Sequence, residues 1–108
     1  MTVNELINRG GFKALALPDG EREITGVYIG DLLSWVMGKA SSGDAWITIM
    51  SNMNIIAVAT LADTACIIVA EGVTLEKELI DMAFSKDVNI LSFDKSIYET
   101  AVELSRLI

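Results

Sequence analysis

Residues 66–70, CIIVA, decide the fold class of this chain. They form a short, unbroken run dominated by β-branched side chains, with no polar residue to face water on either side. Runs of this kind are typical of central strands in parallel sheets, which helices cover on both faces. The segment therefore predicts an interior strand of an α/β sheet.

The segments on either side of residues 66–70 alternate between helix and strand patterns. Residues 54–63 are apolar on all sides and predict a buried helix, whereas residues 75–86 place one apolar stripe opposite charged residues. Capping-box spacings at Thr2–Glu5 and Ser96–Glu99 predict two further helix starts. The remaining expected elements are strands at residues 12–17, 24–29, 45–50 and 89–92 and a helix at residues 31–37.

Alternating strands and helices with short connections imply a small parallel or mixed sheet with flanking helices, built from β-α repeats with right-handed crossovers. The chain has 108 residues and contains no repeat or linker, so residues 1–108 are expected to form a single domain. The order of the strands in the sheet is left open at this point.

The composition argues against a membrane protein and for a subunit interface. The chain is 52% hydrophobic with a mean hydropathy of +0.47, more apolar surface than one small core comfortably hides. The most apolar segment, residues 55–70, is too short to span a bilayer and holds Asp63 at its middle. The first residues do not resemble a secretory signal, and Cys66 is the only cysteine, so a reduced, cytoplasmic setting is expected.

Charge and residue types exclude several further functions. The net charge is -7 and the basic residues are scattered singly, which argues against a nucleic-acid partner. The absence of histidine excludes a Ser-His-Asp triad and imidazole metal sites, and a single cysteine cannot build a zinc cluster. Gly38-Lys39 matches only part of a phosphate loop. We therefore expect no catalytic residue, no metal and no cofactor.

The best candidate for a ligand site is the edge where parallel strands end. Ligands of α/β sheets gather there, because loops and helix N-termini present unpaired N–H groups. The same small polar residues are also ordinary helix caps, which leaves a purely structural role open. Asp31 and Asp63 are the other acids of interest, although neither has a partner for acid/base catalysis. The candidate ligand-binding residues are Ser51, Asn52, Asn54, Glu71, Gly72, Thr74, Ser92, Asp94 and Ser96.

The segment at residues 30–37, GDLLSWVM, is apolar on nearly every side and predicts an interface. A helix there can turn part of its surface onto its own sheet, but Trp35 then points elsewhere. A second copy of the chain could cover it, and so could the loop at residues 18–24 or Trp46 within the same subunit. The candidate interface residues are Leu32, Leu33, Trp35, Val36 and Met37.

The region from Thr25 to Gly72 resembles the DRTGG domain family. The most specific parts of the resemblance are the runs TGVYIGDLLS at residues 25–34, WITI at 46–49 and NIIAVA at 54–59, and the strand that ends in Glu71-Gly72. Thr25-Gly26 match the middle of the motif that gives the family its name, whereas Glu23, Ile24 and Val27 depart from it.

The resemblance implies a regulatory accessory domain. Similar domains accompany catalytic or nucleotide-sensing domains in some phosphotransacetylases and in pyrophosphatases regulated through CBS domains, and a related fold forms the N-terminal domain of HPr kinase. The kinase's catalytic domain has no counterpart here, so no enzyme activity is expected. Two hypotheses follow: a homodimeric sensor of an anionic small molecule, nucleotide or phosphorylated metabolite, or a pure interaction module that docks on a metabolic enzyme.

Overall fold

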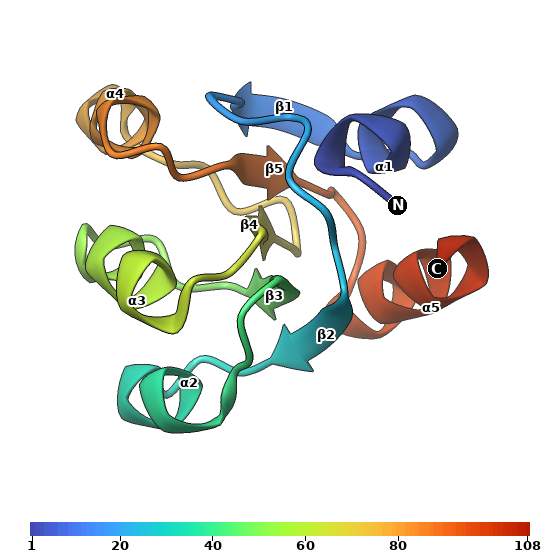
Figure 1. Ribbon diagram of the computed structural model, residues 1–108. Coiled ribbons are helices and arrows are strands. Elements are labelled where there is room, and N and C mark those ends of the chain that lie inside the picture. The colour runs from blue at the N-terminus through green and yellow to red at the C-terminus, as the bar shows by residue number, and fades with distance from the viewer.

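The computed structural model describes residues 1–108 as a mixed sheet between two layers of helices (Figure 1). The sheet has five strands in the order β1-β5-β4-β3-β2. Strands β2 to β5 run parallel, and β1 pairs antiparallel with β5. The elements are α1 (Val3–Arg9), β1 (Lys13–Ala16), β2 (Gly26–Ile29), α2 (Leu33–Lys39), β3 (Asp44–Thr48), α3 (Asn54–Ala62), β4 (Cys66–Val69), α4 (Lys77–Ser85), β5 (Ile90–Ser92) and α5 (Ile97–Leu107).

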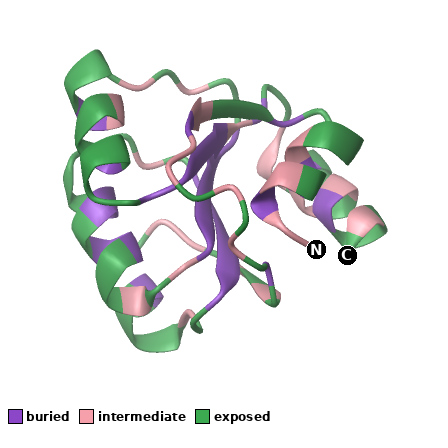
Figure 2. Cartoon of the chain, turned by 45° about the horizontal axis from the view of Figure 1, so that its top comes forward, coloured by how far each residue is buried: buried purple, intermediate pink, exposed green.

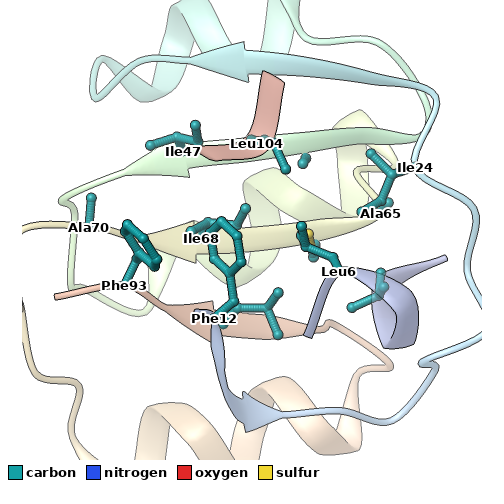
Figure 3. Packing of buried hydrophobic residues seen from close by; sticks show 13 residues of the cluster. Leu6, Phe12, Ile24, Ile47, Ala65, Ile68, Ala70, Phe93 and Leu104 are labelled. Atoms are coloured by element: carbon teal, nitrogen blue, oxygen red, sulfur yellow. The ribbon is translucent and has the colours of Figure 1, made fainter. Parts of the chain in front are cut away.

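Helices α2, α3 and α4 cover one face of the sheet, and α1 and α5 cover the other (Figure 1). Alternate residues of β3 and β4 point to opposite faces, so Trp46 and Ile67 join the core beneath α2, α3 and α4. Ile47 and Ile68 join the core beneath α1 and α5, shown in Figure 3. Burying each such side chain stabilises the fold by about 1.5–3 kcal/mol.

The sequence-based expectations for the fold are largely confirmed. Every residue of β4 is buried, as expected for a central strand with helices on both faces. Both capping boxes form, with Thr2 and Ser96 accepting hydrogen bonds from the backbone N–H groups of Glu5 and Glu99. None of the helices is both long and apolar enough to cross a membrane.

Helix α3 differs from the expected fully buried helix. Its inner face is buried, but Leu61 on its outer side is 73% exposed. The helix lies in an outer layer with no further element above it, and Figure 2 shows the outer surfaces of these helices as exposed. An apolar composition alone did not reveal that one side of α3 faces solvent.

The expected helix at residues 31–37 also needs correction. Helix α2 begins at Leu33, and Leu32 is its N-cap, so Leu32 projects away from the core and is 58% exposed. Val36 is fully buried in the core and cannot contact a second chain, which removes it from the candidate interface. Leu33 is partly buried against the same core. Trp35 (57%) and Met37 (48%) are exposed, with the Lys39 ammonium 4.0 Å from the Trp35 ring centroid.

Candidate ligand-binding site at the carboxyl ends of the strands

The carboxyl ends of β2 and β3 are tied together by Asp31. Its Oδ1 accepts hydrogen bonds from the buried Thr48 hydroxyl at 2.7 Å and from the Ile49 backbone N–H at 3.0 Å. The Trp46 indole N–H donates to the Gly30 carbonyl at 2.8 Å in the same region. The Asp31 carboxylate thus has a structural role at the ends of β2 and β3, and it does not cap α2, whose N-cap is Leu32.

The loop after β4 is fixed against the loop after β5. Glu71 and Gly72 both adopt left-handed backbone conformations, with φ of 63° and 67°. Their N–H groups donate to the carbonyls of Lys95 (2.8 Å) and Phe93 (3.3 Å). A left-handed conformation is common for glycine and uncommon for glutamate. The unusual conformation of Glu71 is therefore a distinctive feature of the turn that follows β4.

These two loops and β1 enclose a cleft of about 360 Å³. Half of its lining is hydrophobic: Leu15 from β1, Ile80 from α4, and Val73, Leu75 and Phe93 from the loops. The remaining lining residues are Lys13, Gly72, Thr74, Ser92 and Asp94. The cleft therefore combines apolar walls with a small number of polar groups, which is the usual character of small-molecule sites.

The polar side chains of the cleft are not used by the fold. Lys13, Thr74, Ser92 and Asp94 make no side-chain hydrogen bond within the protein, and Lys13 forms no salt bridge. Lys13 stands opposite Ser92 in the register of β1 and β5, and both residues line the cleft. An unpaired cation in a cleft that also holds hydroxyl groups is suited to an anionic or phosphorylated group.

Four of the candidate ligand-binding residues come together in this cleft, namely Gly72, Thr74, Ser92 and Asp94. Glu71 and Ser96 do not line the cleft, and their side chains bind the N-terminus of α5 instead. The Glu71 carboxylate accepts a hydrogen bond from the Ile97 N–H at 2.9 Å, and Ser96 is the N-cap. Because the Glu71 carboxylate occupies the helix N-terminus, an added anion there would meet a negative charge.

The remaining candidates, Ser51, Asn52 and Asn54, follow β3 and do not line the cleft. Asn52 Oδ1 accepts a hydrogen bond from the Asn54 N–H at 2.9 Å, which is a local Asx turn just before α3. Their preference for anions stays a prediction. The structure instead adds Lys13 and Leu15, which sequence reasoning missed because it could not place β1 beside β5.

The cleft contains neither a cluster of metal ligands nor a pair of carboxylates. No group of three or more histidine, cysteine, aspartate or glutamate residues could hold a metal ion anywhere in the chain. Asp94 is the only carboxylate among the cleft residues, so a pair of carboxylates for acid/base chemistry is missing there. The arrangement can bind and orient a ligand through hydrogen bonds, charge and apolar contact.

Comparison with known proteins agrees with this architecture. The DRTGG domain family model matches residues 18–107. The structure resembles the CBS and DRTGG domains of the regulatory region of Clostridium perfringens pyrophosphatase, solved with the activator diadenosine tetraphosphate. The TM-score is 0.73 at 15% sequence identity, over 95% of this chain and 45% of the pyrophosphatase chain. A search of curated proteins found no match.

The fold and the cleft define a small mixed α/β domain with a ligand-sized hollow at the carboxyl ends of its strands. The chain belongs to the DRTGG domain family. It spans about half the length of the pyrophosphatase regulatory region that it resembles.

Proposed function

We propose that this chain is a non-catalytic regulatory domain that senses a small anionic molecule, with nucleotides as the preferred class. The observation that carries the proposal is the cleft beside β1, where the side chains of Lys13, Thr74 and Ser92 make no hydrogen bond within the protein. Lys13 is suited to a phosphate group, and the apolar walls are suited to the ring of a base. Asp94 can accept hydrogen bonds from ribose hydroxyl groups.

The solved relative supports the choice of ligand class. The pyrophosphatase regulatory region was crystallised with a dinucleotide activator, and this chain shares the fold of part of that region. At 15% sequence identity, the similarity between the two chains extends to the fold and not to the binding residues. The assignment of the ligand to the cleft therefore rests on the lining residues of this chain.

We further propose that the domain acts as a homodimer in the cytoplasm. Leu32, Trp35 and Met37 remain exposed on and beside α2, and a second copy would remove this apolar surface from water. Cys66 is a free, buried thiol, which fits a reducing compartment.

A second function is favoured by a different surface. Met53, Ile56, Ala57, Leu61 and Met82 line a hollow of about 480 Å³ between α3 and α4. Flexible methionine side chains adapt to varied partners, so this groove is suited to a helix of a metabolic enzyme. In that case the domain would act as an interaction module without a ligand of its own.

A thermal-shift panel separates the two functions. A ligand that binds only the folded protein raises the midpoint of unfolding as its concentration exceeds its dissociation constant. We expect AMP, ATP or inorganic phosphate to stabilise the wild type and to lose this effect in Lys13→Gln. Lys95→Gln is the matched control, because Lys95 lies outside the cleft. A panel without any stabilising compound would favour the interaction module.

The absence of catalysis has a separate test. We expect the purified protein to hydrolyse neither nucleotides nor phosphoesters, because the cleft lacks a histidine, a phosphate loop and a metal constellation. Turnover that follows the protein through two different purification steps would contradict this expectation.

A further inference from the structure

The two edges of the sheet differ in how they are protected. An edge strand exposes unpaired N–H and C=O groups, and proteins usually protect it with charged residues, proline or a bulge. At the β1 edge, Lys13 supplies a charge, and the register shifts between Ala14 and Ala16. At the β2 edge, residues 26–30, GVYIG, contain no charged residue and no proline. Strand β2 is therefore an unprotected edge.

The free backbone groups of β2 belong to Val27 and Ile29. The Gly30 N–H donates to the Ile47 carbonyl of β3 at 3.2 Å. Because alternate residues of a parallel strand bond to the same neighbour, Tyr28 also faces β3, and Val27 and Ile29 face away from it. Their N–H and C=O groups point outward in the plane of the sheet, where a further strand could add.

None of the side chains that line the surface next to this edge is charged. Val27 and Ile29 are 38% and 47% exposed and border a hollow of about 580 Å³ between β2 and α5. Its other lining residues are Tyr28, Ala101, Ser105 and Ile108. The strand-end cleft, by contrast, holds Lys13 and Asp94. In a chain of net charge -7, a surface without charged side chains is where two copies can approach with little repulsion between side chains.

We propose that β2 pairs antiparallel with β2 of a second copy, across a two-fold axis at Tyr28. In this register Val27 lies opposite Ile29 of the partner subunit, and each such pair exchanges both backbone hydrogen bonds. The proposal rests on the homodimer proposed above and specifies its geometry. Helix α2 lies on the same side of the molecule as β2 (Figure 1), so this contact brings the second copy to the side that carries α2.

A second copy fits this edge for two reasons. A two-fold contact requires a self-complementary surface, and a strand that pairs antiparallel with itself meets that requirement without any other feature. The paired segments carry no charge, so no like charges oppose each other across the axis. A second copy of the chain is also available as a partner wherever the protein is made.

Sedimentation velocity on Ile29→Lys tests the pairing. Ile29 is half exposed in one copy, so lysine is tolerated in the monomer, but the dimer would bury its charge. We expect the dissociation constant of the dimer to rise more than about tenfold. Leu61→Lys is the matched control, because it introduces the same residue at the exposed side of α3, and it should leave the dimer intact.

A cysteine at position 28 gives a second test that does not depend on destabilising the dimer. Directly opposed residues that are not hydrogen-bonded have Cα atoms about 4.5 Å apart, within the range of a disulfide. Tyr28→Cys should therefore form a disulfide-linked dimer under mild oxidation. Ala14→Cys on β1 is the control and should remain unlinked, and the buried Cys66 is present in both variants.

The outcomes separate the homodimer from its geometry. A wild type that is monomeric at micromolar concentration overturns both proposals. A wild-type dimer that Trp35→Glu dissociates, while Ile29→Lys does not and Tyr28→Cys stays unlinked, keeps the homodimer and overturns the pairing of β2. If Ile29→Lys fails to fold, the disulfide of Tyr28→Cys decides: a linked dimer supports the pairing, and an unlinked one contradicts it.

Discussion

The Thr48 hydroxyl donates a hydrogen bond of 2.7 Å to Asp31 Oδ1, and this contact joins the ends of two neighbouring parallel strands. Thr48 is completely buried, and its hydroxyl also accepts a hydrogen bond from the Met50 N–H. One carboxylate and one hydroxyl thus organise the turns that follow β2 and β3. The contact lies at the carboxyl ends of the parallel strands, as does the proposed ligand cleft, but the cleft lies beside β1 on the other side of the sheet.

Asp31→Ala is expected to destabilise the protein by about 1–3 kcal/mol, because it leaves the buried Thr48 hydroxyl and the Ile49 N–H without their acceptor. Urea unfolding followed by circular dichroism measures the loss. Asp31→Asn keeps an oxygen acceptor and should lose less. Equal stability of Asp31→Ala and the wild type would show that Asp31 does not hold the two turns together.

Asp63 is expected to make stability fall on the acid side. The Arg22 guanidinium donates to Asp63 Oδ1 at 3.0 Å, and this bond, followed by the one from Ser42, holds the Asp63 pKa below its ordinary value of 3.8. A pKa lowered in the folded state contributes stability above the unfolded value, and this contribution is lost as pH falls through the folded pKa. The loss is therefore confined to pH below about 4.

The matched variant for this effect is Asp63→Asn. Residue 63 has a left-handed backbone with φ of 58°, which asparagine also tolerates, so the substitution changes the charge and keeps the turn. Urea unfolding at pH 7 and at pH 3 should show a smaller loss of stability in Asp63→Asn than in the wild type. Equal losses would mean that the Asp63 ion pair, which is exposed to solvent, contributes nothing measurable.

Cys66 is expected to be inert in the folded protein. Burial raises the pKa of its thiol from 9.0 to about 12, so the reactive thiolate is scarce at pH 8. Iodoacetamide should modify Cys66 only after denaturation. Mass spectrometry of the native and the denatured protein after labelling would measure this difference. Because the pKa of the thiol is raised in the folded state, the contribution of Cys66 to the free energy of unfolding is fully present below pH 9. This contribution is lost as pH rises toward about 12. Rapid labelling of the native protein would contradict the buried position of β4.

The strand pattern of β4 could be predicted because burial on both faces leaves a continuous β-branched run. The cleft could be predicted only in part, since Gly72 follows a strand and Ser92 ends a strand that are visible in the sequence. Lys13 is also visible, but its place beside Ser92 depends on strand order, which local patterns do not encode. Asn89 shows the same limit: its buried amide bonds to the backbone of Asp19, 70 residues away in the chain.

Glycine positions show a further difference between pattern and structure. The pair Gly26 and Gly30 has a spacing known from membrane helices, yet both lie at the ends of a strand. A Cβ atom on Gly26 would lie 2.5 Å from Asp44 Oδ1, so the absence of a side chain at Gly26 leaves room for the Asp44 carboxylate. The neighbouring Thr25-Gly26 match to the family motif thus has a structural explanation at the amino end of β2.

Nuclear magnetic resonance titration of the isotope-labelled protein with AMP tests ligand sensing at the cleft most directly. We predict saturable shifts of the backbone amides of Gly72, Thr74, Ser92 and Asp94, and weaker binding in Lys13→Gln than in Lys95→Gln. The absence of saturable shifts with AMP, ATP and inorganic phosphate, or shifts confined to residues 51–54, would contradict the cleft as the ligand-binding site.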